Sequence, residues 1–199
     1  MTFKPTLRRI VERSAPGRTP SFNEAQVVKA LELASKGGIG RASLGTSIGI
    51  GEGMVRTLIK HLSKEDLIEV SPKGVLTSKK GERFLTEIHS ILRMTGIPNT
   101  IDTVGAHNYA VLVKGASKQV RLGVEQRDAA ILTGARGATT IVYKKGLWIP
   151  GMDRKPDVEL SEFIENNLHP EEEDVVIIGT GDNVLDAEIG ALSAAIDLV

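Results

Sequence analysis

Hydrophobic and polar residues separate most clearly onto two faces within residues 51–62. At about 100° per residue, a helix over this stretch has one apolar arc. That arc holds Met54, Val55, Leu58, Ile59 and Leu62. The opposite arc holds Glu52, Gly53, Arg56, Thr57 and Lys60. The pattern predicts a helix that buries one face and exposes the other. An ordinary surface helix and a DNA-reading helix share this pattern, so the flanking segments must separate the two interpretations.

A short helix and a glycine-containing turn are predicted upstream. Residues 39–48 give a short apolar entry and then a helix with Leu44 and Ile48 turned inward, and Gly49 breaks it. Helix, turn and second helix are the parts of a helix-turn-helix, whose second helix lies in the major groove of DNA.

A β-hairpin is predicted downstream. Residues 67–70 and 75–77 are short β-prone runs, and Ser71-Pro72-Lys73-Gly74 joins them with a proline and a glycine at turn spacing. A hairpin directly after a recognition helix is a wing, and Lys73 lies at its tip.

Together these motifs resemble those of winged-helix transcriptional regulators. The resemblance covers about residues 21–94 and rests on Ile39-Gly40-Arg41, Gly51-Glu52-Gly53-x-Val55-Arg56, Leu67-Ile68 and Leu76-Thr77-x-x-x-Gly81. The chain also resembles an uncharacterised archaeal family that joins such a winged helix to a small acidic domain, which implies no particular ligand. The resemblance implies double-stranded DNA as the partner. The expected DNA contacts are Arg41, Ser43, Glu52, Gly53, Arg56, Thr57, Lys60 and Lys73.

The overall composition limits the possible classes of protein, but it hides an uneven distribution of charge along the chain. The chain has 199 residues, 41% of them hydrophobic, no cysteine and a formal net charge of zero. Residues 1–96 hold 16 Lys and Arg against 9 Asp and Glu, whereas residues 97–199 hold 9 against 16. This difference of +7 against −7 indicates that the N-terminal half binds a polyanion and that the C-terminal half has another role. Since no signal-like or membrane-spanning apolar run is visible, we expect a soluble, cytoplasmic protein with no membrane partner.

Residues 1–20 carry Lys4, Arg8, Arg9, Arg13 and Arg18. They predict either a basic arm that follows DNA phosphates or a frayed, solvated terminus. Ser21, with Glu24 three residues later, predicts the start of a helix that runs to about Lys36.

A further helix is predicted from a cap at Thr77 to just before Gly96 and Pro98. Its apolar rhythm runs through Gly81, Phe84, Ile88, Ile91 and Thr95. This row of residues predicts either the interface of a homodimer or a surface that packs on the winged-helix core. We expect a homodimer, because symmetric operators require a two-fold protein. The change of composition places a domain boundary between residues 96 and 97.

The predicted organisation is therefore a basic arm (1–20), a winged-helix domain (21–96) and a C-terminal α/β domain (97–199), within an α+β or α/β two-domain fold class. In the last domain the predicted strands and helices alternate. Strands are expected at 109–113, 138–143, 147–149 and 175–178, and helices at 125–135, 159–168 and 183–198.

Two loops of this domain are candidate ligand sites. Gly179-Thr180-Gly181-Asp182-Asn183 lies between a buried strand and a helix, where free N–H groups favour anions. The same residues would equally suit a tight turn with a helix cap. In the loop 133–140, Arg136 and Thr139 are the expected contacts, although Arg136 could instead pair with an acidic neighbour. An anionic or polyol effector is the expected ligand.

Catalytic chemistry finds no support in the sequence. The four histidines show no metal-ligand spacing, and no cofactor motif is complete. We therefore expect a sequence-specific transcriptional regulator whose C-terminal domain senses a metabolite or mediates dimerisation. The alternatives are a metabolite-processing enzyme with a regulatory winged helix and a protein-interaction scaffold, because fold does not determine function.

Overall fold

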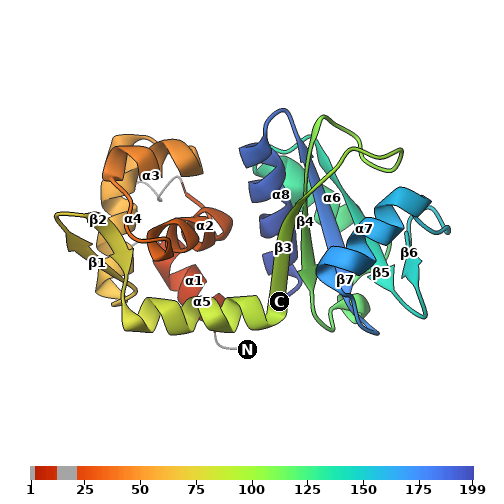
Figure 1. Cartoon of the computed structure of the whole chain (residues 1–199), viewed down its shortest axis with the longest axis horizontal. Helices are drawn as coiled ribbons and strands as arrows, with labels where there is room; N and C mark the ends of the chain where they lie inside the picture. The colour runs from red at the N-terminus through yellow and green to blue at the C-terminus, as the bar shows by residue number, and fades with distance from the viewer. Residues whose placement is uncertain (1–2, 13–21) are drawn as a thin grey trace. The chain divides into compact units, whose positions relative to one another are not determined.

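The structure, a computed structural model, describes residues 3–12 and 22–199. The chain forms two compact units, Met1–Ser90 and Ile91–Val199 (Figure 1). The first unit is mainly helical with a small hairpin, and the second is built on a five-stranded sheet. This confirms the predicted two-domain α+β organisation.

The first unit contains five helices and one hairpin within the described residues. In chain order these are α1 (Phe3–Val11), α2 (Glu24–Ser35), α3 (Arg41–Ile48), α4 (Glu52–Lys64), β1 (Ile68–Ser71), β2 (Gly74–Thr77) and α5 (Lys79–Ile91). The helices and the hairpin predicted for residues 39–77 are confirmed.

Helix α1 packs into this unit rather than extending as an arm. Phe3, Leu7 and Ile10 are buried along one side of it. The Ile10 carbonyl lies 2.6 Å from Nδ1 of the buried His61, which ties α1 to α4. The prediction of an arm over residues 1–20 is thus wrong for residues 3–11, because the apolar stripe has a core to cover. Arg13 and Arg18 lie outside the described residues.

Two predicted helix caps are corrected. Helix α2 begins after Asn23, whose side chain accepts from the Gln26 N–H at 2.9 Å while the Gln26 side chain accepts from the Asn23 N–H at 3.0 Å. This capping box leaves no role as cap for Ser21, itself outside the described residues. For α5 the cap is Ser78, whose hydroxyl accepts from the Gly81 N–H at 3.0 Å, and Thr77 belongs to β2.

Helix α5 ends at Ile91, several residues earlier than predicted, and strand β3 (Leu92–Ile97) follows at once. The division into two units accordingly falls at residue 90 and not at 96. Within the predicted row, Phe84 and Ile88 are buried, and Thr95 lies on β3. Phe84 and Ile88 therefore pack on the core of the chain itself, while Ile91 and Thr95 are only partly buried, and a homodimer remains a prediction.

The second unit is one antiparallel sheet with helices on both faces. Its strands are β3, β4 (His107–Val113), β5 (Gly137–Tyr143), β6 (Leu147–Trp148) and β7 (Val175–Gly181), in the order β3-β4-β7-β5-β6. Every pairing is antiparallel. The helices are α6 (Val124–Leu132), α7 (Val158–Leu168) and α8 (Val184–Asp197), with a short 3-10 turn at Ser117–Gln119. Because the sheet is antiparallel, the rule that places ligands at the carboxyl ends of parallel strands does not apply here.

Strand β7 lies at the centre of this sheet, and all seven of its residues are buried. Val176 and Ile178 belong to a core with Leu160 and Ile164 of α7. Helices α6 and α8 cover the opposite face (Figure 1). No helix within residues 3–12 and 22–199 is long and apolar enough to cross a membrane.

Candidate nucleic-acid interface

The angle between α3 and α4 is held by close packing at their turn. Gly49 ends α3 with φ of 72°, a left-handed conformation that favours glycine. At Gly45 a Cβ atom would lie 2.9 Å from both the Ile50 carbonyl oxygen and Val55 Cγ2, so only glycine allows the helices to approach this closely. The Gln26 side-chain amide donates to the Ile48 carbonyl at 2.9 Å. These contacts fix the orientation of α4.

Helix α4 buries its predicted apolar face and exposes its predicted polar face. Val55, Leu58 and Leu62 are buried. Glu52, Gly53, Arg56 and Lys60 are exposed. Thr57 is half-buried, and its hydroxyl donates to the Gly53 carbonyl at 3.1 Å. The exposed residues form one continuous polar surface, which we call the α4 polar face.

The charged groups on this face are available for a partner. Arg56 donates to Glu52 at 2.5 Å, with both side chains about two-thirds exposed or more, at 67% and 73%. An ion pair so open to water contributes little stability, so a base or phosphate can replace the carboxylate at small cost. Arg41 and Lys60 are exposed and make no ion pair within the described residues.

A groove of about 550 Å³ lies between α3 and the start of α4. Its polar lining includes Arg41, Thr46 and Glu52, and Ser43 is exposed on the same helix as Arg41. Of the predicted contacts, Arg41 on α3 and Glu52 on α4 therefore line the same groove.

The hairpin is attached to the strand-like segment before α3. Ile39 and Val75 exchange two backbone hydrogen bonds, at 3.0 and 2.9 Å. A Cβ at Gly74 would lie 2.5 Å from the Ile39 carbonyl oxygen, which requires glycine at the base of the turn. Lys73 is exposed at the tip. The β1–β2 hairpin is thus joined by backbone hydrogen bonds to the segment that leads into α3, and its role as a wing stays a prediction.

The predicted ligand residues on β7 make contacts within the chain. A Cβ at Gly179 would lie 2.3 Å from the Ala187 carbonyl oxygen, and one at Gly181 would lie 2.6 Å from the Ala187 N–H nitrogen. Both glycines therefore allow α8 to lie directly on β7. Thr180 is buried, and its hydroxyl donates to Asn108. Asn183 caps α8 by accepting from the Asp186 N–H at 3.0 Å.

The remaining candidates also have partners. Arg136 forms an exposed ion pair with Asp182, and the Thr139 hydroxyl donates to the Asp102 carbonyl at 3.3 Å. These contacts are those of a tight turn, a helix cap and an acidic neighbour for Arg136, the structural interpretations given above. Ligand binding by these seven residues stays a prediction.

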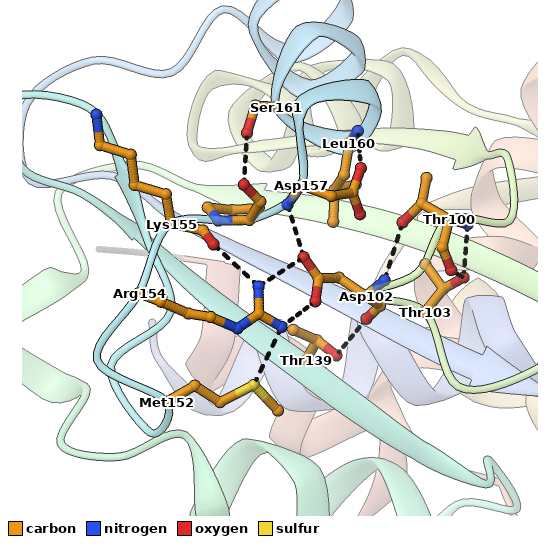
Figure 2. A network of polar contacts seen from close by, with 11 residues as sticks. Thr100, Asp102, Thr103, Thr139, Met152, Arg154, Lys155, Asp157, Leu160 and Ser161 are labelled. Atoms are coloured by element: carbon orange, nitrogen blue, oxygen red, sulfur yellow. Dashed lines mark hydrogen bonds and ion pairs between the residues drawn. The ribbon is translucent and has the colours of Figure 1, made fainter.

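Sequence reasoning missed a polar network around Asp102, which Figure 2 shows. The Asp102 side chain is 3% exposed and accepts from both terminal nitrogens of Arg154, one of them at 3.0 Å. It also accepts from the Asp157 N–H at 2.7 Å, and Asp157 in turn caps α7 through the Leu160 N–H at 2.8 Å. The network joins the loop after β3 to the segment that leads into α7. No periodicity links residues 52 positions apart, so the pattern carried no signal.

The hydrogen bonds from Arg154 are the main cause that lowers the pKa of Asp102, and the Asp157 N–H adds to it. Burial of the carboxyl acts in the opposite direction but is the smaller effect. Asp102 is therefore a charged buried group that holds two loops together. Among the described residues there is no group of three or more His, Asp or Glu placed to hold a metal ion.

Comparison with known proteins gives a different family model for each of the two units. Residues 25–92 match the family model described as the CggR N-terminal DNA binding domain, and residues 104–198 match a domain of unknown function, DUF4443. The central glycolytic genes regulator of Priestia megaterium is 28% identical over 85 residues, which are 41% of this chain but only 25% of that protein. The chain thus spans a quarter of the length of this curated relative.

A solved structure resembles nearly the whole chain. The hypothetical protein from Pyrococcus horikoshii OT3 is 25% identical with a TM-score of 0.73, covering 89% of this chain and 93% of its own. The two-unit fold is therefore shared with another protein, while the archaeal assignment stays a prediction. Residues 25–92 thus resemble the DNA-binding domain of a transcriptional regulator, and a separate sheet-containing domain follows them in the chain.

Proposed function

We propose that this protein is a sequence-specific regulator that places the α4 polar face in the major groove of duplex DNA. The observation that supports this most is that α4 exposes Arg56, Lys60 and a glycine on one side, while its other side packs against α1, α3 and β1. A helix of this kind fits the major groove, where side chains at its start contact base edges.

The chemistry of the α4 polar face suits base contacts. Arginine donates in bidentate fashion to O6 and N7 of guanine, and glutamate accepts from N4 of cytosine. Arg56 donates to Glu52 one helical turn away, so the two side chains lie next to each other on this face. We infer that this pair contributes to specificity, whereas Lys60, Arg41 and Ser43 contribute contacts to phosphates.

The second unit, in this proposal, senses a small metabolite or joins two copies of the chain. A homodimer would present two α4 helices to half-sites one helical turn apart, about 34 Å. The second unit is rich in acidic residues and is therefore unsuited to contact the DNA backbone, because phosphates repel carboxylates.

Replacing Gly53 with alanine should stabilise the first unit and weaken DNA binding. Nothing lies within 4 Å of the added Cβ, and the backbone is helical, so the fold should gain about 0.5–1 kcal/mol from a better helix former. The methyl group would stand where we expect DNA to approach most closely. Thermal unfolding and fluorescence anisotropy with a labelled duplex measure the two effects.

A matched control is Gly96→Ala, which is also exposed with open space around it but lies in the second unit. A Gly53→Ala protein that binds DNA as tightly as wild type would exclude close approach at this position.

Lys73→Ala should weaken binding modestly and to a similar degree on all duplexes. If Lys73 neutralises one phosphate, the slope of the logarithm of the binding constant against that of salt concentration should become shallower by about 0.9. Lys118→Ala, an exposed lysine of the second unit, should leave the slope unchanged. Loss of affinity for one sequence only would instead assign a base contact to the wing.

A further inference from the structure

The two outer strands of the five-stranded sheet differ in how they are protected from further pairing. Strand β6 has only two residues, whereas β3, at the opposite edge, has six (Figure 1). Natural proteins protect an edge strand by making it short or by placing a lysine, a proline or a bulge in it. Strand β3 contains no lysine and no proline, and it pairs with β4 without a bulge along its whole length. It is therefore a long, regular edge without these protections.

The only charged residue of β3 is occupied by α7. The Arg93 guanidinium donates to the Leu168 carbonyl at 2.8 Å and to the His169 carbonyl at 3.1 Å. These carbonyls lie at the carboxyl end of α7, where a positive charge is favourable. Arg93 is thus held against a helix on one face of the sheet, and its charge does not protect the edge.

Alternate residues of β3 direct their backbone groups to the outer side of the sheet. The Lys114 N–H donates to the Ile91 carbonyl at 3.0 Å, one step beyond the paired residues of β3 and β4. Because hydrogen bonding alternates along an antiparallel pair, the odd-numbered residues of β3 bond to β4 and the even-numbered ones point outward. The outward N–H groups of Met94 and Gly96 have no hydrogen bond to any described residue. Gly96 is exposed, and nothing lies within 4 Å of the position of its missing Cβ.

A second copy of β3 complements this edge when the two strands run antiparallel about a two-fold axis. Pairing Met94 with Met94 of the other copy overlaps residues 92–96 completely. Each Met94 N–H then donates to the Met94 carbonyl of the other copy, and each Gly96 N–H donates to the Leu92 carbonyl of the other copy. Arg93 lies opposite Thr95 in this register, so no two like charges face each other across the strands.

We propose that β3 pairs with β3 of a second copy, Met94 opposite Met94, in one continuous sheet with five strands from each copy. This rests on the assembly role proposed for the second unit and assigns that role a surface. Since each copy contributes a single strand, the interface is small, and we expect a dissociation constant in the micromolar range. The test below contains no DNA, so its failure would leave DNA binding by the first unit untouched.

Sedimentation equilibrium of the full chain should show a dimer at about 100 μM. Met94→Pro removes an outward N–H, and an edge strand tolerates proline where its nitrogen faces outward. This variant should weaken the dimer at least about tenfold and keep the circular dichroism spectrum of the wild type. Met94→Leu is the matched control, because it changes the same side chain but keeps the N–H, and it should dimerise as the wild type does.

Single introduced cysteines test the register, because the chain has no cysteine of its own. Oxidation of Met94→Cys should give a disulfide-linked dimer, since directly paired Cα atoms lie about 5.5 Å apart, within the range that a disulfide spans. Gly96→Cys should cross-link far more slowly, because the two copies of this residue are four positions out of register, about 14 Å apart. A monomeric wild type at about 100 μM, an undiminished dimer of Met94→Pro, or equal cross-linking of the two cysteine variants would each overturn the proposal.

Discussion

Replacing Arg56 or Lys60 by glutamate is expected to weaken duplex binding by at least about tenfold each, while the domain stays folded. Both side chains are exposed on α4, so neither substitution creates a cavity or buries a charge. Arg56→Glu places a second carboxylate one turn from Glu52, which should cost only about 0.2–0.5 kcal/mol of stability. Fluorescence anisotropy with a labelled duplex gives the affinities, and circular dichroism melting gives the stabilities.

Lys118→Glu is the matched control, because it makes the same change of net charge on the second unit. It should alter duplex binding only slightly, through the long-range field that salt screens. Wild-type affinity in both α4 variants would contradict the assignment of α4 as the DNA-contacting helix.

Asp102→Ala is expected to lower the unfolding free energy of the second unit by about 2–3 kcal/mol, because it removes the acceptor of the Asp157 N–H and the buried partner of Arg154. The carboxyl is almost fully buried, so water cannot replace it without rearrangement of both loops. Urea unfolding followed by the fluorescence of Trp148, which lies in this unit, measures the change. Asp128→Ala removes an exposed carboxylate from another arginine and should cost no more than about 0.5 kcal/mol. Equal losses in the two variants would show that the Asp102 network adds nothing beyond a surface ion pair.

The direction of the Asp102 pKa shift predicts how the stability that Asp102 contributes depends on pH. The pKa of Asp102 is lowered in the folded chain, mainly by the hydrogen bonds from Arg154. Its stabilising contribution is therefore complete above the unfolded pKa of about 3.9 and is lost as the pH falls through the folded value. The stability gap between wild type and Asp102→Asn should be constant near neutral pH and shrink below about pH 4. A gap that persists undiminished in acid would contradict this origin.

The first unit could be predicted well because its signals are local. The apolar face of α4, the break at Gly49 and the Pro72 turn each act within a few residues, and each formed as expected. Strand β3 was missed because Leu92 and Thr95 continue the helical rhythm of α5. The conformation of β3 is decided by its pairing with β4, which lies outside the local apolar pattern.

In the second unit, the same glycines fit two explanations that sequence cannot separate. Gly179 and Gly181 could admit a ligand or a helix, and the close approach of α8 shows that a helix takes that space. The pairing of Asp102 with Arg154 arises from residues far apart in the chain. Such long-range contacts have no periodicity, so only the folded arrangement reveals them.

The central claim is that α4 selects a duplex sequence, and selection from a randomised duplex pool tests it most directly. Wild type and an Arg56→Glu, Lys60→Glu double variant would be carried through the same rounds at physiological salt. We predict that wild type enriches one sequence motif and that the double variant, though folded, enriches none. Failure of wild type to enrich any motif, or enrichment of the same motif by the double variant, would contradict the claim.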